Sequence, residues 1–276
     1  MAQVWIVTGS SRGLGRAIAE DALAAGHHVV ATARRPEQLK DLVDQYGKSV
    51  LPLQLDVSDE DQVSSVVGKA IEAFGRVDVV VNNAGYGDIS SVEDVDLDDF
   101  RRQIDTNFYG VVYMTKAVIP VMRKQGTGHV IQISSLGARI SSPGMTAYQS
   151  AKWAVSGFSS GLAQEVAPLG IKVTVLEPGG MRTDWAGSSM TIPTISEPYL
   201  PTVGAAAEGV RAYGGSEPSD PKKIAALVRR ILALEEPPVR LLVGDDAIDY
   251  VDATERAQAE SDKKWQHLTR SVSFDQ

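Results

Sequence analysis

Cysteine is absent from the 276 residues of this chain, which excludes a disulfide framework, a thiolate metal site and a thiol nucleophile. Histidine is scarce: His27 and His28 are neighbours, whereas His129 and His267 stand alone. This distribution predicts packed or solvated imidazoles and no metal centre. The formal net charge is −8 and no long basic run occurs, so we expect no nucleic-acid partner.

Long apolar runs are also missing. No stretch approaches the roughly 20 residues that a membrane-spanning helix needs, and residues 4–7 form an apolar segment without a charged leader before it. We therefore expect a soluble, cytoplasmic protein with no membrane partner. A hydrophobic content of 43% is enough for a large core, and the absence of a linker or repeat predicts one domain over residues 1–276.

Seven short β-branched segments alternate with longer segments of helical periodicity. The predicted strands are residues 3–8, 28–33, 50–55, 77–82, 129–134, 171–177 and 239–243. Their continuous apolar character is typical of parallel strands that are covered on both faces. Glycines end the helical segments before five of these strands, at Gly26, Gly47, Gly75, Gly126 and Gly170. The sequence thus predicts an α/β fold, a Rossmann-type doubly wound parallel sheet of about seven strands with helices on both faces.

Two regions depart from this alternation. Residues 184–219 are rich in proline, glycine and serine, which predicts a long loop with short helical turns. Its apolar side chains either line a substrate pocket or fold the loop onto the core; they are Trp185, Met190, Ile192, Ile195, Tyr199 and Leu200. Residues 245–276 predict a charged amphipathic helix and a polar tail, and such a helix offers a cover for the edge of the last strand.

A glycine-rich segment joins the first predicted strand to the first helix. Its glycines permit a tight turn, close approach of the backbone to a pyrophosphate and close packing of the helix on the sheet. The amides and the dipole at the helix start favour phosphate. We therefore assign nucleotide binding to Gly9, Ser11, Arg12, Gly13, Leu14 and Gly15.

The end of the second strand distinguishes between the two nicotinamide dinucleotides. An acidic residue there would bind the ribose hydroxyls of NAD, but this chain has Arg34 and Arg35 and no carboxylate. Arg34, together with Arg12, suits a 2′-phosphate, so we expect NADP(H) as the cofactor. Asp56, followed by Val57, is expected to bind the adenine; alternatively, Asp56 only caps the next helix.

A tyrosine and a lysine four residues apart, Tyr148 and Lys152, lie on one face of a predicted helix. The lysine charge is expected to lower the high pKa of the phenol, which makes Tyr148 a usable acid in carbonyl reduction and a base in alcohol oxidation. Ser135 follows a strand at its carboxyl end, where its hydroxyl can bind the substrate oxygen.

These motifs resemble those of the short-chain dehydrogenase/reductase family, in its single-domain oxidoreductase branch. The resemblance covers residues 3–243. It rests on the glycine segment at 8–15, the Asn-Asn-Ala-Gly turn at 82–85, Asn107, Ser135, the Tyr148–Lys152 pair, and Pro178-Gly179 followed by Thr183. Taken singly, the Asn-Asn-Ala-Gly and Pro-Gly segments are also typical of plain turns, and Asn107 of a helix residue bonded to backbone.

The resemblance implies further roles. Asn107 would hold a water that links Lys152 to solvent, and Lys152 would also bind the nicotinamide ribose. Asn83, Ala84 and Gly85 would line the adenosine side, whereas Pro178, Gly179 and Thr183 would hold the nicotinamide carboxamide. Members of the family commonly pair their long helices, here around residues 100–124 and 148–169, into dimers or tetramers, so a homo-oligomer is expected.

The sequence is compatible with three functions. An NADP(H)-dependent oxidoreductase that reduces a small, apolar carbonyl compound, or oxidises the corresponding secondary alcohol, is favoured because the catalytic side chains are complete. A sensor or scaffold that binds NADP without turnover is the alternative, although such relatives typically lose the tyrosine or the lysine. A sugar-nucleotide epimerase or dehydratase of the extended branch is disfavoured by the glycine spacing and the modest C-terminal length.

Overall fold

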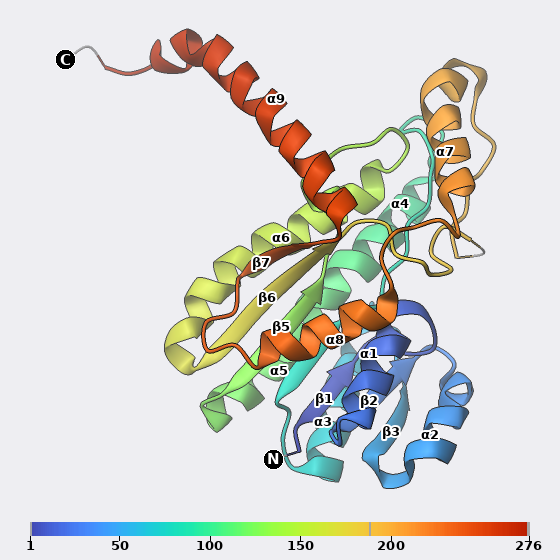
Figure 1. The fold of residues 1–276 in the computed structure, drawn as a ribbon, viewed down its shortest axis with the longest axis vertical. Coiled ribbons are helices and arrows are strands. Elements are labelled where there is room, and N and C mark those ends of the chain that lie inside the picture. The colour runs from blue at the N-terminus through green and yellow to red at the C-terminus, as the bar shows by residue number, and fades with distance from the viewer. Residues whose placement is uncertain (1, 188, 275–276) are drawn as a thin grey trace.

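One parallel sheet organises the protein (Figure 1). The computed structural model describes residues 2–187 and 189–274; positions 1, 188, 275 and 276, which belong to the predicted domain, loop and C-terminal extension, lie outside the described residues. The strand order is β3-β2-β1-β4-β5-β6-β7. The strands are β1 (Val4–Val7), β2 (His28–Ala33), β3 (Val50–Gln54), β4 (Val79–Asn82), β5 (Gly128–Ile133), β6 (Ile171–Pro178) and β7 (Arg240–Val243). The predicted doubly wound sheet is confirmed, and each strand ends within two residues of the predicted limits.

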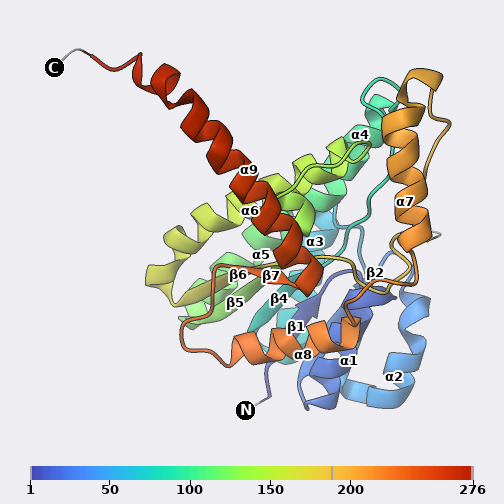
Figure 2. The same cartoon turned by 45° about the horizontal axis from the view of Figure 1, so that its top comes forward.

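Helices cover both faces of the sheet. They are α1 (Gly13–Ala24), α2 (Lys40–Tyr46), α3 (Glu60–Phe74), α4 (Leu97–Ile104), α5 (Gly110–Gln125), α6 (Thr146–Val166), α7 (Ala205–Tyr213), α8 (Pro221–Leu232) and α9 (Asp245–Arg270). In both views, α1 and α8 lie side by side on one face (Figures 1 and 2). On the opposite face α3, α5 and α6 pack against the strands.

Alternate side chains of a strand enter two separate hydrophobic clusters. In β1, Trp5 and Val7 join the cluster beneath α1 and α8, whereas Ile6 joins the cluster beneath α3 and α5. In β4, Val79 and Val81 likewise face away from Val80. Because both faces are buried, these strands carry no polar alternation, which is why their sequences are continuously apolar.

The glycines that were expected to end helical segments adopt the left-handed conformation. Gly26, Gly47, Gly75, Gly126 and Gly170 have φ angles between +54° and +84°. Gly170 also has no room for a side chain, because a Cβ atom would lie 2.3 Å from the carbonyl oxygen of Gly126. These helix ends were therefore readable from the sequence.

The segment 184–219 is more helical than the sequence indicated. Its described part contains a π-helical turn, Leu200–Gly204, that leads directly into α7. Three consecutive alanines, at positions 205–207, begin α7 and favour a helix despite the prolines before them. The two ends of the segment meet beside β6, since the amide of Arg182 donates to the carbonyl of Ser219 at 3.0 Å.

The helix α9 does not cover the edge of β7, so that expectation was wrong. It starts at the carboxyl end of β7 and then projects away from the sheet (Figures 1 and 2). Its buried residues are Ala247 and Val251, in the first two turns. Over the described residues, no helix combines the length and apolar character required to cross a bilayer.

Candidate active site

A cleft of about 450 Å³ lies at the carboxyl ends of the strands. The turns after β1, β2, β3 and β4 contribute to its walls, together with α6 and the segment that follows β6. Fifteen of the predicted site residues line it: Gly9, Ser11, Arg12, Gly13, Leu14, Arg34, Asp56, Val57, Asn83, Ala84, Gly85, Asn107, Tyr148, Lys152 and Thr183. Parallel strands end at one edge of a sheet, so residues far apart in the sequence converge there.

Four predicted residues are not among those that line the cleft: Gly15, Ser135, Pro178 and Gly179. Ser135 nevertheless hydrogen-bonds Tyr148, which does line it. A Cβ atom on Gly15 would lie 2.4 Å from the carbonyl oxygen of Gly9, so this glycine permits the close packing of α1 under the loop. Pro178 ends β6, and the amide of Gly179 donates to the carbonyl of Val243 at 2.9 Å.

The start of α1 is suited to an anionic ligand. Arg12 precedes the helix with extended backbone, and no side chain among the described residues caps its first turn. The amides of that turn are therefore available to phosphate oxygens, with the positive end of the helix dipole behind them. The glycine loop, which has no space for a Cβ atom at Gly15, thus fits the pyrophosphate of a dinucleotide.

Two arginines, Arg12 and Arg34, line the cleft. Arg34 is exposed and lines the cleft, whereas Arg35 is exposed and does not. Arg12 reaches across the cleft, and its guanidinium contacts the carboxylate of Asp184 at 3.0 Å. Both partners of this ion pair are well exposed, so it contributes little to stability and can be exchanged for another anion.

The alternative role of Asp56 as a helix cap was wrong. The side chain that caps α3 belongs to Asp59, which accepts from the amide of Gln62 at 3.0 Å. Asp56 instead accepts from the amide and the hydroxyl of Ser58, at 3.0 and 2.6 Å. It lines the cleft together with Val57, and its role in binding adenine stays a prediction.

The Asn-Asn-Ala-Gly turn holds the central strands together. The hydroxyl of Thr8, at the end of β1, accepts from the amides of Asn83 and Ala84 at 2.9 and 3.0 Å. The side-chain amide of Asn83 donates to the carbonyl of Thr8 at 2.9 Å. The turn after β4 is thereby fixed against the glycine loop after β1.

Tyr148 and Lys152 are both buried at the inner end of the cleft. Burial raises the pKa of Tyr148 to about 12, although a hydrogen bond with Ser135 acts in the opposite direction. The direction of this shift is opposite to the one expected from the sequence, because desolvation of the phenolate outweighs its stabilisation. Burial also lowers the pKa of Lys152 to about 8. At neutral pH, Tyr148 is accordingly a protonated phenol.

Lys152 is held in a defined position. Its ammonium group donates to the carbonyl of Ile133 at 2.9 Å and lies 5.6 Å from the centre of the Tyr148 ring. Ser135 accepts from the amide of Gly137 at 3.0 Å, which orients its hydroxyl beside Tyr148. The three side chains come from the end of β5 and from α6, and the fold brings them together.

Asn107 lies in a π-helical turn, Asp105–Tyr109, that connects α4 to α5. Its side-chain amide donates to the carbonyls of Tyr86 and Gln103, both at 2.8 Å, and its oxygen accepts from the amide of Tyr86 at 3.2 Å. The side chain is thus committed to backbone. Gly85 packs against it, since a Cβ atom there would lie 2.5 Å from the Asn107 oxygen.

Sequence reasoning missed several cleft residues. Ser134, which precedes the predicted serine, lines the cleft, as do Tyr86 and Asp88. Tyr86 and Asp88 directly follow the Asn-Asn-Ala-Gly turn, and this position at the end of a central strand was the signal that could have identified them. Ser189 and Thr191 add polar atoms from the segment after β6.

The apolar side chains of the 184–219 segment divide between the two predicted roles. Trp185 lines the cleft, and its ring lies 5.3 Å from that of Tyr148. Met190, Ile192, Ile195 and Tyr199 instead pack into a cluster that fixes the segment over Tyr148. Leu200 is 52% exposed.

Comparison with known proteins identifies the family. A profile described as short chain dehydrogenase matches residues 3–191. The chain is 58% identical over 270 residues to Oxidoreductase BOA17 of Botryotinia fuckeliana, covering 98% of each chain. A short-chain dehydrogenase from Streptomyces avermitilis, 38% identical, matches with a TM-score of 0.94 over 99% of this chain and all of that chain. The chain belongs to the short-chain dehydrogenase family.

Solved relatives also show what such clefts hold. A serine dehydrogenase in complex with NADP+ is 27% identical, with a TM-score of 0.76 over 87% of this chain and 94% of that chain. Other similar structures hold NADP or NADH. The chain is therefore an oxidoreductase of the short-chain dehydrogenase family, and its glycine loop and arginines fit a nicotinamide dinucleotide.

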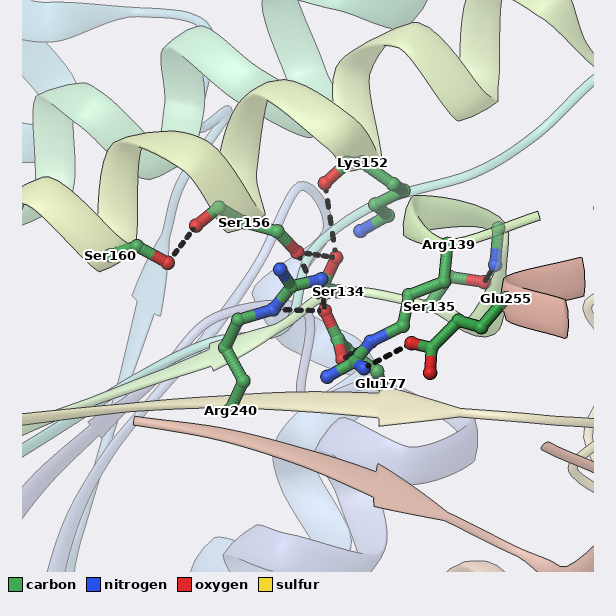
Figure 3. A network of polar contacts seen from close by, with 10 residues as sticks. Ser134, Ser135, Arg139, Lys152, Ser156, Ser160, Glu177, Arg240 and Glu255 are labelled. Atoms are coloured by element: carbon green, nitrogen blue, oxygen red, sulfur yellow. Dashed lines mark hydrogen bonds and ion pairs between the residues drawn. The ribbon is translucent and has the colours of Figure 1, made fainter. Parts of the chain in front are cut away.

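In this family member, a buried carboxylate organises a network of polar contacts next to Ser135 and Lys152 (Figure 3). Glu177 of β6 is completely buried. It accepts from Arg139 at 2.7 Å, from Ser156 at 3.0 Å and from Arg240 at 2.8 Å. The three donors come from the turn after Ser135, from α6 and from β7, so one carboxylate ties together four elements.

This network continues to α6, the helix that carries Tyr148 and Lys152. The hydroxyls of Ser156 and Ser134 lie 3.1 Å apart, and Ser134 contacts the backbone carbonyl of Lys152 at 3.2 Å. On the solvent side, Arg139 also reaches Glu255 of α9 at 3.4 Å (Figure 3). The end of β5 and the catalytic turn of α6 are thus both fixed through Glu177.

We expect Glu177→Gln to lower the free energy of unfolding by about 2 kcal/mol or more, because loss of the negative charge leaves two partly buried guanidinium groups beside each other without a counter-charge. Glu255→Gln is the matched control, since it removes an exposed partner of the same arginine and should change stability by less than about 0.5 kcal/mol. Urea denaturation of both variants measures the difference. Equal destabilisation would show that the buried carboxylate is not the organising group.

Proposed function

We propose that this protein is an NADP(H)-dependent carbonyl reductase that also oxidises the corresponding secondary alcohol. The observation that carries the proposal is the grouping of Ser135, Tyr148 and Lys152 at the inner end of a cleft whose outer end presents a glycine loop and two arginines. Proton transfer and dinucleotide binding are thus supported in one continuous space.

The bound cofactor would supply or accept the hydride. The chain's own part is to hold the substrate oxygen between the hydroxyls of Ser135 and Tyr148, and to deliver a proton from Tyr148 as charge develops on that oxygen. Because burial raises the pKa of Tyr148, this residue is protonated at neutral pH, which is the form that donates a proton in reduction. Lys152 orients the site through Ile133 and contributes positive charge beside the phenol.

Several of the proposed cofactor contacts follow the sequence interpretation. Arg34 and Arg12 would bind the 2′-phosphate, and Asp56 with Val57 the adenine. Thr183, Pro178 and Gly179 would lie toward the nicotinamide carboxamide, and Asn83 to Gly85 along the adenosine side. The water-holding role of Asn107 stays a prediction, since its side chain is bonded to backbone.

The substrate wall of the cleft combines aromatic and polar groups. The ring of Trp185 lies beside Tyr148, and Asp88, Ser189 and Thr191 present polar atoms to the same cleft. We therefore propose a small carbonyl substrate with an apolar body and a polar group at one end. Of the apolar residues that the sequence offered for a substrate pocket, Trp185 is the one that lines the cleft among the described residues.

A panel of carbonyl and alcohol compounds, assayed with NADPH and NADH, tests the proposed function. We expect reduction of at least one ketone with NADPH. The alternative of a sensor or scaffold requires NADPH binding without turnover of any panel member, and no observed feature favours it. We also propose that the protein acts in the cytoplasm as a homo-oligomer, in keeping with the predicted pairing of its long helices.

The cofactor preference is tested first at Arg34. Arg34 presents an exposed guanidinium group in the cleft. Arg34→Asp should therefore reduce the affinity for NADPH by about tenfold to a hundredfold, whereas the affinity for NADH should stay similar or increase. Arg35→Asp is the matched control, since Arg35 lies outside the cleft. Calorimetric titration of both dinucleotides measures the change. Equal affinities of the unmodified protein for NADPH and NADH would refute the preference.

A second prediction concerns the ion pair of Arg12 with Asp184. Asp184→Asn removes a competing anion and a negative charge near the proposed phosphate site, so NADPH should bind about twofold to fivefold more tightly. NADH carries the pyrophosphate but no 2′-phosphate, so its affinity should rise less. If the affinity for NADH rises as much as that for NADPH, Arg12 does not recognise the 2′-phosphate.

The proton donor is tested at Tyr148. Loss of the hydroxyl in Tyr148→Phe should reduce kcat by about a hundredfold or more while NADPH affinity stays near its original value. Tyr86→Phe removes a second hydroxyl from the same cleft and should reduce kcat by less than about tenfold. Steady-state kinetics with the best panel substrate decides, and a Tyr148→Phe variant with near-normal kcat would require another acid.

A further inference from the structure

The helix α9 carries one continuous stripe of small and apolar side chains. The residues recur at three- and four-residue intervals, as on one face of a helix: Ala247, Tyr250, Thr254, Ala257, Ser261, Trp265 and Leu268. Ala247, at its start, is buried against the body of the protein, and Val251 beside it is also buried. The same face then continues along the helix without a covering element.

Every residue from 252 to 274 is exposed. Trp265 is 48% and Leu268 53% exposed, and Val272, one turn beyond Leu268, is 87% exposed. Helices in proteins take most of their stability from packing of an apolar face, and this part of α9 has no such packing against the residues that the structure describes. Among the described residues, Glu255 is the one charged member of α9 with an ion-pair partner. The exposed apolar face of this projecting helix therefore indicates a surface that packs against another protein segment.

The charges of α9 are segregated along its length. Residues 245–262 carry seven carboxylates and one arginine, whereas residues 263–270 carry Lys263, Lys264 and Arg270 and no carboxylate. Complementation of the helix dipole accounts for charges in the first and last turns, but the carboxylates extend through Glu260 and Asp262, far beyond the first turn. The segregation instead suits a partner helix with the reverse order of charges.

We propose that α9 pairs with α9 of a second copy of this chain, antiparallel, about a two-fold axis near Ser261. In this register the Ser261 residues of the two copies lie opposite each other. Trp265, the largest side chain of the stripe, lies opposite the small Ala257 of the other copy. The acidic part of each helix lies beside the basic part of the other. Glu260 of one copy flanks Lys264 of its partner on both sides of the axis.

This pairing concerns assembly, and it does not depend on the proposed cofactor or substrate. It is also separate from pairing through the long helices α5 and α6, because α9 projects away from the sheet (Figures 1 and 2). Both contacts can form in one oligomer. The test must therefore report on α9 itself and not only on total mass.

The absence of cysteine makes such a test direct. A single Ser261→Cys substitution in the full chain should give a disulfide-linked dimer on mild oxidation, because the two cysteines meet at the axis. Leu268→Cys should give none, since its two copies would lie about 20 Å apart along the paired helices, well beyond disulfide reach. The absence of a crosslink at position 261 would overturn the proposal. Equal crosslinking at position 268 would also overturn it, because it would indicate that the two helices pair in parallel or collide at random.

Charge variants in the Ser261→Cys background test the register. Glu260→Lys or Lys264→Glu alone places like charges together and should slow crosslinking about threefold to tenfold at low salt. A mixture of these two variants restores opposite charges across the axis and should crosslink as fast as the parent, with the mixed dimer as the product. Asp252→Lys, on the opposite face of α9, is the control and should have little effect. A mixture that stays slow, or a control that slows equally, would overturn the register.

Discussion

The close packing of the glycine loop against the turn after β4 is the constraint on which the rest of the site depends. A Cβ atom at Gly15 would overlap the side chain of Asn83, at 2.3 Å, and the carbonyl oxygen of Gly9. The hydroxyl of Thr8 fixes the same turn through two backbone amides. This contact joins the two halves of the doubly wound sheet where the strand order reverses. It fixes the start of α1, where phosphate binding is proposed, relative to Gly85 and Asn107, which line the same cleft as Tyr148 and Lys152.

The catalytic group is supported from below by a second constraint. Glu177 lies beneath α6 and is hydrogen-bonded to Ser156 of that helix. Ser134, which contacts both Ser156 and the backbone of Lys152, belongs to the same polar network. A buried carboxylate with two arginine partners is not in itself a large gain in stability, because both charges lose water. Its effect is positional, since the carboxylate specifies where β5, β6, β7 and α6 meet. Arg139 extends this foundation to Glu255 at the base of α9, and Asp246 accepts from the amide of Gly180 at 2.7 Å. The projecting helix is therefore anchored beside both the catalytic turn and the segment after β6.

Burial alters the chemistry that the sequence suggested. The spacing of Tyr148 and Lys152 placed both side chains on one helical face, and the expectation was a phenol with a lowered pKa. The structure buries both groups, so the neutral phenol is favoured and the lysine pKa falls. Spacing along a helix reports which side chains are neighbours, whereas the direction of a pKa shift depends on how much water reaches them. That depends on the segment after β6, whose Trp185 lies against Tyr148.

The sequence by itself determined the features that are local or periodic. The strands could be predicted as continuous apolar segments because both of their faces are buried. The helix ends could be predicted from glycines because only glycine readily adopts positive φ. Most cleft residues were also predictable, since parallel strands end at one edge and the chemistry follows each strand. Only the tertiary structure decided what no local pattern encodes. It showed that Asp59 caps α3 in place of Asp56, that Gly15 and Gly179 serve packing behind the cleft, and that Glu177 is the common partner of Arg139 and Arg240. It also showed that α9 leaves the sheet. These outcomes depend on contacts between residues that are distant in the sequence. Such residues compete for the same space and the same hydrogen-bond partners, and only the packing of the elements decides which contacts form.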